Sequence, residues 1–256
     1  MTPMIFDTHA HYDDNRFDAD RDTLLAGMPG NRVCGIVNAG SDLKSSRAGI
    51  TIAARYDYMW AAAGIHPHEA EDAPVDFEVE LRELLAMPRV VAVGEIGLDY
   101  HYDLSPRDVQ QNVFERQLSV AKELDLPVII HSREAAEDTM CIINKHAPRG
   151  VVHSFSGSVE TAMELISLGM YIGIGGMATF RNAKKPAAVA AAIPIDRLVL
   201  ETDAPYMAPE PLRGKRCNSA MIIHTAAKIA ELRGITVDEL LVQTEINARE
   251  LFSLDK

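Results

Sequence analysis

Eight short runs rich in valine, isoleucine and glycine alternate with longer amphipathic stretches along this chain of 256 residues. The alternation predicts parallel strands joined by crossover helices, because parallel neighbours need a long connection between them. Eight such units in about 250 residues are typical of a single closed (β/α)8 TIM barrel. The first run is not followed by the Gly-x-Gly-x-x-Gly fingerprint of a dinucleotide-binding sheet. The runs are Met4–His11, Gly35–Gly40, Met59–Pro67, Val90–Leu98, Pro127–Ser132, Gly150–Phe155, Tyr171–Gly176 and Leu198–Asp203.

Capping residues mark several of the expected helices. Ser105-Pro106 places a hydroxyl before a proline at the first helical position, and Ser158 precedes another apolar-periodic stretch. Residues 219–233 and 237–252 predict two terminal helices, the second capped by Thr236. We find no linker or low-complexity tract, so residues 1–256 are expected to form one domain.

Composition excludes several classes of protein. Hydrophobic residues at 47% and charged residues at 24% are ordinary for a globular domain, not for a disordered or fibrous chain. The three cysteines show no CxxC spacing, which indicates neither a disulfide framework nor a zinc module. We see no signal-peptide pattern and no apolar run of about 20 residues. We therefore expect a cytoplasmic protein that does not engage a membrane, and no obligate protein partner is evident.

The first run carries polar side chains at every second residue. Alternate side chains of a strand share a face, so Asp7, His9 and His11 are expected to point together. Two imidazoles placed in this way can bind one metal ion. A strand that merely ends in two exposed histidines is the alternative, and the pair alone does not decide between them.

Further side chains of the metal-ligand type end later runs, namely Glu95, His131, His153 and Asp203. The carboxyl ends of TIM-barrel strands meet at one mouth, where catalytic residues gather. A single histidine there is more often a hydrogen-bonded rim residue, but buried carboxylates beside several imidazoles need a cation. The set predicts two divalent metal ions bridged by one carboxylate. Zn²⁺ and Mn²⁺ suit mixed nitrogen and oxygen ligands, and Mg²⁺ is a less suitable candidate.

Such a centre predicts hydrolysis. A divalent ion lowers the pKa of bound water from about 15.7 to about 7 and polarises the oxygen under attack. Asp203 is the expected general base, and Asp7 is expected to contact a metal ligand rather than the metal. The same centre would also serve a carbonyl substrate: a cyclic amide, a lactone or a D-aminoacyl-tRNA ester. A non-catalytic binding module is the third alternative.

The net charge of −12 argues against a protein that holds nucleic acid by bulk electrostatics. Residues 181–216 nevertheless contain seven basic and four acidic residues, a local excess of three positive charges. Their cations follow the last two strand-like runs, where such barrels often bind phosphate, so we expect a phosphate-binding rim there rather than a merely solvated face. The rim comprises Arg181, Lys184, Lys185, Arg213, Lys215 and Arg216. Aromatic residues after strand ends are candidates for stacking on bases or for core packing: Tyr100, Phe155, Phe180 and Tyr206.

Seven motifs, in order, cover almost the entire chain: Asp7–His11, Gly64–His68, Gly94–Tyr100, Leu126–Arg133, His153–Gly157, Glu201–Pro205 and Arg213–Arg216. Together they resemble the TatD family of metal-dependent deoxyribonucleases, within the amidohydrolase-type barrels. The resemblance implies a (β/α)8 barrel with two divalent metal sites that hydrolyses phosphodiester bonds of DNA. It also implies exonuclease action from the 3′ end, with single strands or frayed ends preferred.

The resemblance further implies roles for individual residues. One ion would be held by His9, His11, Glu95 and Asp203, and the other by Glu95, His131 and His153, with Glu95 as the bridge. Asp203, Glu95 and His66 are the expected catalytic residues, and His66 and Arg133 would contact the substrate together with Arg213, Lys215 and Arg216. One departure stands out, because the family often continues the basic loop with Asn-Glu-Pro, whereas this chain reads Cys217-Asn218-Ser219-Ala220.

Overall fold

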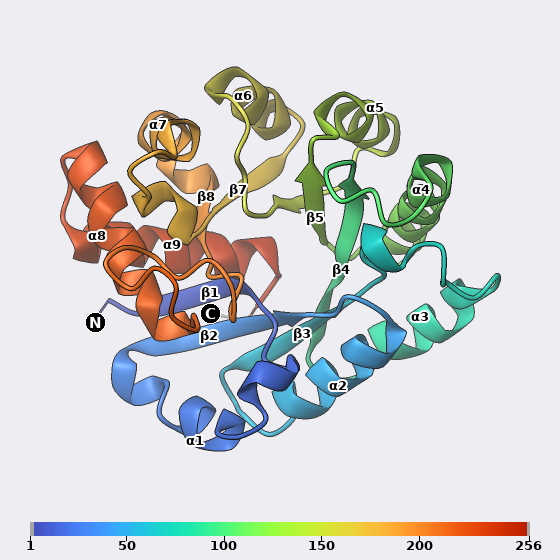
Figure 1. Ribbon diagram of the computed structural model, residues 1–256, viewed down its shortest axis with the longest axis horizontal. Coiled ribbons are helices and arrows are strands. Elements are labelled where there is room, and N and C mark those ends of the chain that lie inside the picture. The colour runs from blue at the N-terminus through green and yellow to red at the C-terminus, as the bar shows by residue number, and fades with distance from the viewer. Residues whose placement is uncertain (1–2, 255–256) are drawn as a thin grey trace.

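The computed structural model of the protein describes residues 3–254, which form one parallel sheet curled into a barrel with helices outside it (Figure 1). The strands follow one another around the sheet in chain order, which confirms the predicted (β/α)8 TIM barrel. They are β1 (Ile5–Ala10), β2 (Val33–Ala39), β3 (Met59–Ala63), β4 (Val90–Asp99), β5 (Val128–Arg133), β6 (Gly150–Val152), β7 (Met170–Ile174) and β8 (Leu198–Leu200).

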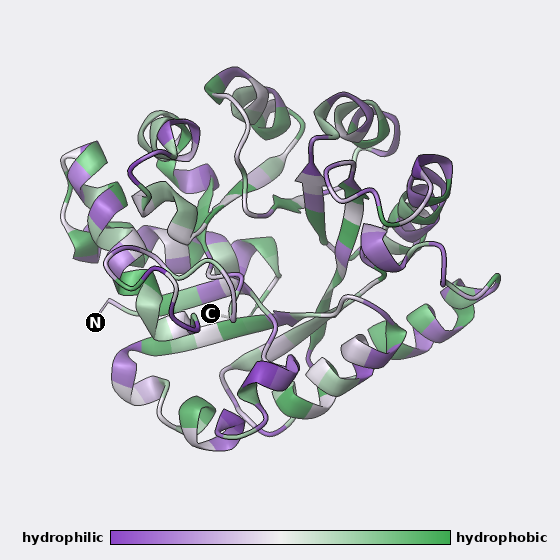
Figure 2. Ribbon diagram, in the orientation of Figure 1, coloured by the Kyte–Doolittle hydropathy of each residue, from purple (hydrophilic) through white to green (hydrophobic). Residues whose placement is uncertain are grey.

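The helices surround the sheet and alternate hydrophobic and hydrophilic bands (Figure 2). Within the described residues they are α1 (Arg21–Ala26), α2 (Leu43–Ala53), α3 (Phe77–Leu85), α4 (Arg107–Glu123), α5 (Ala136–His146), α6 (Val159–Ser167), α7 (Lys184–Ala192), α8 (Ile222–Arg233) and α9 (Val237–Leu251). Each helix in this part of the chain is too short or too polar to cross a lipid bilayer.

Two of the predicted helix starts are confirmed. The Ser158 hydroxyl accepts the Thr161 backbone N–H at 3.2 Å and begins α6. Thr236 begins α9 in a reciprocal capping box with Glu239, in which each side chain accepts the other residue's backbone N–H. Such caps satisfy backbone donors that have no partner inside the helix.

The cap predicted at Ser105 is wrong. Helix α4 begins at Arg107 with Pro106 in the N-cap position and no side-chain cap. The buried Ser105 hydroxyl instead accepts the Glu71 backbone N–H at 3.1 Å and donates to the His68 carbonyl at 3.0 Å. It ties the loop after β4 to the loop after β3, because those buried backbone groups have to be satisfied.

The core has two layers. One apolar residue from each strand contributes to a cluster inside the barrel, and Leu251 and Phe252 from the end of the chain's last helix pack against that cluster. The other buried residues pack the outer faces of the strands against the helices. The inner cluster includes Phe6, Val37, Ala62, Ala92, Ile129, Val151, Tyr171 and Val199. Apolar packing therefore fills the floor of the barrel and leaves the polar residues at the other end.

Several strands end earlier than the sequence predicts. Strand β6 stops at Val152 and β8 at Leu200, so that His153 and Asp203 lie in the turns that follow. Ser154 and Asp203 have φ angles of 46° and 64°, a left-handed conformation that breaks a strand. Glu95, by contrast, lies inside β4, which continues to Asp99.

The barrel closes beyond the end of β8. The His11 backbone N–H donates to the Ala204 carbonyl at 2.7 Å, and the Asp203 N–H donates to the His9 carbonyl at 3.0 Å. Asp7 strengthens this seam, because its carboxylate accepts the backbone N–H of Thr202 at 3.0 Å and the Thr202 hydroxyl at 2.7 Å. These bonds fix the segment that carries Asp203 against the end of β1.

We predict that Thr202→Val lowers the free energy of unfolding by about 1–3 kcal/mol, because it leaves the buried Asp7 carboxylate without its hydroxyl donor. Thr202→Ser keeps the hydroxyl and serves as the matched control. Urea denaturation of both variants measures the difference. Equal stability of the Val variant and the wild-type protein would show that the seam does not depend on this bond.

Candidate metal centre

The structure brings seven of the predicted site residues together at the carboxyl ends of the strands. Glu95 on β4 lies among them and is only 3% exposed. Its six neighbours come from the ends of five strands, because His9 and His11 both lie at the end of β1. The seven are His9, His11, His66, Glu95, His131, His153 and Asp203.

The Glu95 carboxylate faces imidazoles on two sides. Its Oε2 lies 3.3 Å from His9 Nε2 and 3.5 Å from His11 Nε2. Its Oε1 lies 2.9 Å from His131 Nδ1 and 2.8 Å from His153 Nε2. The two oxygens therefore serve two separate groups of nitrogen atoms.

Asp203 completes the first of these groups. Its Oδ1 lies 3.4 Å from His11 Nε2 and 3.6 Å from His9 Nε2. The left-handed backbone of Asp203 turns the carboxylate into the mouth, and such outliers often mark functional positions. With Glu95 Oε2, this group offers two nitrogen and two oxygen atoms to one ion.

The electrostatics of the cluster fit cations. Burial raises the pKa of Glu95, but the neighbouring imidazoles of His153, His66 and His9 outweigh burial and hold that pKa well below its usual range. Burial and the nearby His153 lower the pKa of His9 to about 4, so its ring is neutral. His9 Nε2 and His11 Nε2 lie only 3.0 Å apart. Burial lowers the pKa of His11, but Asp203 and Glu95 outweigh burial and raise that pKa to about 9. Ring nitrogens that converge beside carboxylate oxygens are the donor set expected of a transition-metal site.

In two of the imidazoles, the ring nitrogen that faces away from the cluster has a hydrogen-bond partner. His11 Nδ1 lies 2.9 Å from the Ala39 carbonyl, and His131 Nε2 lies 3.1 Å from Asp99 Oδ2. Asp99 is 1% exposed, contacts His68 Nε2 at 2.9 Å, and accepts the backbone N–H of Tyr102 at 2.9 Å. Such partners orient metal-binding histidines and fix which nitrogen is free.

Sequence reasoning gave Asp99 no role. A usable signal exists, because Glu95, Gly97 and Asp99 are alternate residues of β4 and so share a face of the strand. The predicted run stops at Leu98, one residue before Asp99.

His66 has a defined proton position. Its Nδ1 accepts the His68 backbone N–H at 3.2 Å, so in the neutral ring Nε2 carries the hydrogen. Burial lowers the pKa of His66 well below its usual range, which keeps the ring neutral. Nε2 lies 3.5 Å from Glu95 Oε1 and can donate a hydrogen bond into the site. This arrangement fits a substrate contact better than a metal ligand.

Asp7 does not share a face with His9 and His11, contrary to the prediction. The pairing of β1 with β2 shifts register between Asp7 and Ala10, which breaks the strict alternation. Asp7 contacts the backbone N–H of His9 and the Thr202 segment, not an imidazole. Burial raises its pKa to about 6. Its role is to hold backbone at the seam of the barrel.

The side chains predicted to bind phosphate differ in whether a carboxylate already pairs with them. The Arg133 guanidinium stacks on the Tyr102 ring at 4.7 Å and that of Arg213 on Phe180 at 4.4 Å, and neither has a carboxylate partner in residues 3–254. Lys215 is also exposed. Arg216, in contrast, donates to both carboxylate oxygens of Asp20, at 2.8 and 2.6 Å.

The aromatic residues predicted to stack on bases differ in their exposure. Phe155 is buried in the core, and the Tyr100 hydroxyl donates to Asp138 at 2.7 Å. Tyr206 is 42% exposed, and Tyr102, which we did not predict, is 54% exposed. The Tyr102 ring also lies edge-on to the His68 ring, with the two ring centroids 5.4 Å apart. This contact connects the rim with the centre.

The loop Cys217-Asn218-Ser219-Ala220, which departs from the family pattern, begins a short helix. Asn218 caps a short 3-10 helix, Ser219–Met221, by accepting the Ala220 N–H at 3.1 Å. Burial raises the pKa of the Cys217 thiol to about 12, so the thiol stays protonated at neutral pH.

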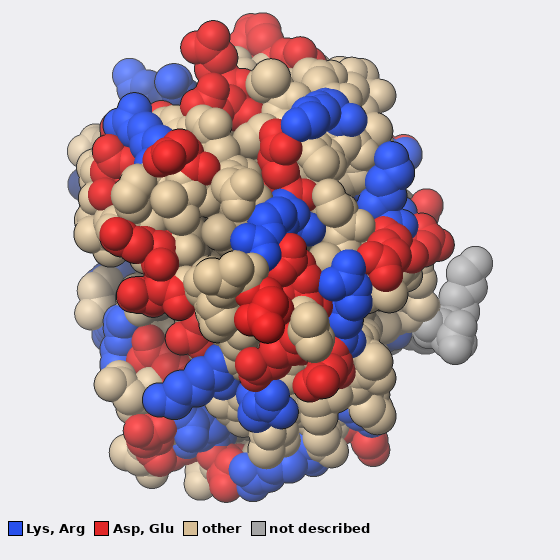
Figure 3. Space-filling view, turned by 90° about the vertical axis from the view of Figure 1, so that its right-hand side faces the viewer, with Lys and Arg blue, Asp and Glu red and all other residues tan. Residues whose placement is uncertain are grey.

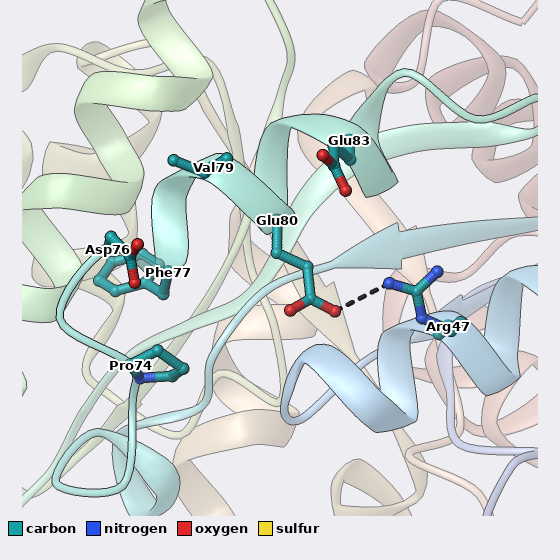
Figure 4. Close-up of a pocket in the computed structure, with 7 residues that line it drawn as sticks. All are labelled: Arg47, Pro74, Asp76, Phe77, Val79, Glu80 and Glu83. Carbon is teal, nitrogen blue, oxygen red and sulfur yellow. Dashed lines mark hydrogen bonds and ion pairs between the residues drawn. The ribbon is translucent and has the colours of Figure 1, made fainter.

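A groove elsewhere on the surface lies between α2 and α3 (Figure 4). Arg47 pairs there with Glu80 at 2.8 Å, and its other lining residues include Asp76 and Glu83. The groove contains no imidazole and is separate from the ligand cluster. On the face shown in Figure 3, acidic side chains gather near the middle and basic side chains lie around them.

The family model described as TatD related DNase matches residues 6–253. A Bacillus subtilis (strain 168) protein named uncharacterized metal-dependent hydrolase YabD is 41% identical over 255 residues, which cover 98% of this chain and 100% of that protein. The chain belongs to the TatD family. The resemblance drawn from its motifs is therefore confirmed.

Other TatD proteins agree over the same length. A protein of Erwinia tasmaniensis named 3′-5′ ssDNA/RNA exonuclease TatD is 34% identical over 259 residues, covering 98% of this chain and 100% of that one. The crystal structure of YjjV, a TatD homologue from Escherichia coli K12, superposes with a TM-score of 0.93 at 33% identity and covers 100% of both chains. The TatD relatives thus share the barrel and not only the motifs.

Proposed function

We propose that this TatD protein is a divalent-metal-dependent deoxyribonuclease that removes nucleotides from the 3′ end of single-stranded or frayed DNA. The observation that carries the proposal is the Glu95 carboxylate, whose two oxygens face two separate sets of imidazoles. A carboxylate in this position can bridge two ions, and paired ions suit in-line displacement at phosphorus. The family match and the names of the relatives support the same reaction class.

The donor set fits two divalent ions. His9, His11, Asp203 and Glu95 Oε2 would hold one, and His131, His153 and Glu95 Oε1 the other. Three buried or half-buried carboxylates whose pKa values are lowered by their neighbours lie in or beside the cluster, and bound cations would balance their charges. These carboxylates are Glu95, Asp99 and Asp203. Nitrogen-rich ligands favour Zn²⁺ or Mn²⁺ over Mg²⁺.

Each residue of the site has its own proposed role in hydrolysis. Bound divalent ions supply a water of lowered pKa and polarise the phosphoryl oxygen. Asp203 accepts the proton of the attacking water, because its carboxylate stands at the open side of the cluster. His66 donates a hydrogen bond from its Nε2–H to the substrate, and Arg133 binds a phosphate oxygen with a guanidinium that has no carboxylate partner in the described chain.

A carbonyl substrate is less well supported. The same ions would hydrolyse a cyclic amide, a lactone or an aminoacyl ester, but Arg133 and Arg213 at the rim are cations without carboxylate partners in the described chain. Free guanidinium groups favour a substrate that carries several phosphates, which argues against a cyclic amide or a lactone.

The proposal is tested with linear and circular single-stranded DNA and blunt duplex DNA, each with Mn²⁺. A terminus reaches a concave mouth more easily than the backbone of a rigid duplex, so we expect mononucleotides from the linear strand, slow cutting of the duplex and an intact circle. The same reactions with EDTA are the control. Rapid cutting of the circle would contradict end entry, and no cleavage of any DNA would refute the nuclease.

We predict that Glu95→Ala lowers turnover by at least about 10²–10³-fold, the effect of removing one group that stabilises charge in the transition state. The variant should also lose bound metal, because it removes the one side chain shared by both ions. His153→Ala should lose one ion only. Metal content per chain and DNA turnover measure this, with Glu164→Ala on the exposed face of α6 as control. A Glu95 variant with two ions and a normal rate would show that no bridge exists.

We predict that Arg133→Gln and Arg213→Gln combined weaken DNA binding and flatten its dependence on salt. Each lost phosphate contact should reduce the slope of log K against log[salt] by about 0.7 for a single strand. Binding of a labelled oligonucleotide at several salt concentrations measures the slope. Arg47→Gln, in the groove between α2 and α3, is the matched control. An unchanged slope in the double variant would remove both arginines from the DNA path.

A further inference from the structure

Glu201 is a buried carboxylate that the reaction above does not use. It follows β8 directly, is 1% exposed, and alternates with Val199 of the inner core and with Asp203. Its Oε1 accepts the backbone N–H of Ser154, the residue after His153. Its Oε2 is buried without any hydrogen-bond partner in residues 3–254. Burial of such a group has a large cost unless it serves a neighbour.

That neighbour is His153. His153 Nε2 faces the centre, at 2.8 Å from Glu95 Oε1 and 3.2 Å from His131 Nδ1. A neutral ring that presents the Nε2 lone pair to an ion carries its hydrogen on Nδ1. Within the described chain this Nδ1 has no hydrogen-bond partner, and Glu201 Oε1 lies 3.9 Å from it. A shift of about 1 Å would give an ordinary hydrogen bond.

The surrounding backbone makes room for this contact. Gly173 on β7 lies against both residues: a methyl group there would overlap Glu201 Oε2 and come within 3.1 Å of His153 Cα. Ser154 has a left-handed φ of 46°, and the Glu201 carboxylate holds its N–H in that turn. Glu201 thus fixes the backbone after His153 and lies behind its ring.

The two groups of histidines differ in the partners that lie behind their rings. His131 is backed by the Asp99 carboxylate at 3.1 Å, whereas His11 is backed only by the Ala39 carbonyl at 2.9 Å. Both histidines of the second group therefore have a carboxylate behind them, and the histidines of the first group do not. A carboxylate partner increases the affinity of a histidine for metal.

We propose that Glu201 is a positioning residue that orients His153 and so controls binding of the second ion, the one shared by His131, His153 and Glu95. The inference rests on the proposed metal centre. Glu201 itself touches neither the ion nor the substrate. Its removal should weaken one ion site and leave the other unchanged.

The test is titration of the metal-free full-length protein with Co²⁺, followed by calorimetry and by the visible absorption of bound Co²⁺. Wild type should bind two ions. Glu201→Ala should bind the second about 10–100-fold more weakly, the size of effect seen when such partners are removed, with an altered spectrum for that ion only. Glu201→Gln should recover part of the affinity, because its amide oxygen still accepts a hydrogen bond. Glu164→Gln on α6 is the matched control.

Gly173→Ala provides a second variant if Glu201→Ala does not fold, because its methyl displaces the carboxylate and should cause the same selective loss. Two Co²⁺ ions bound with wild-type affinity and spectrum in the folded Glu201→Ala or Gly173→Ala protein would overturn the positioning role. A wild-type protein that binds fewer than two ions would overturn it as well, together with the two-ion centre. A wild type that binds two ions and cuts no DNA refutes the nuclease alone and leaves the role of Glu201 supported by the titration.

Discussion

The site is organised by one buried carboxylate. Glu95 is almost completely removed from water, and such a charge is tolerated only where cations or strong donors surround it. The barrel supplies imidazoles from strands on both sides, so that each oxygen has its own partners. The same arrangement that stabilises the charge leaves two clusters of nitrogen and oxygen atoms. Stability of the buried group and capacity for metal are therefore consequences of one geometry.

The closure of the barrel positions the first cluster. β8 is only three residues long, and the ring is completed by the segment after it, which Asp7 and Thr202 hold against β1. Asp203 stands at the end of that segment in a left-handed conformation. Its carboxylate reaches His9 and His11 because both ends of the seam are fixed by buried hydrogen bonds. A seam of this kind makes Asp203, the proposed general base, part of the fold rather than of a mobile loop.

The rim indicates how an acidic chain could receive the proposed polyanionic substrate. The net charge of −12 describes the whole chain, whereas Arg133 and Arg213 lie over aromatic rings with their N–H groups unengaged by carboxylates of the described chain. Arg216, close by in sequence, is bound to Asp20 instead. What matters for phosphate is thus the number of uncompensated donors at the mouth, which the total charge does not report.

The sequence by itself predicted the barrel and six of the seven residues of the candidate centre, because strand periodicity and strand order are local properties of the chain. His9, His131, His153 and Asp203 were all predictable in this way. The family and His66 came instead from the resemblance of its motifs. The alternation of Glu95, Gly97 and Asp99 indicates that Asp99 lies on the same strand face as Glu95. The tertiary structure alone decided that Asp99 lies behind His131, that Glu201 lies behind His153, and that Asp7 turns away from the cluster. These contacts depend on a register shift and on which strands lie side by side, which no periodic pattern encodes.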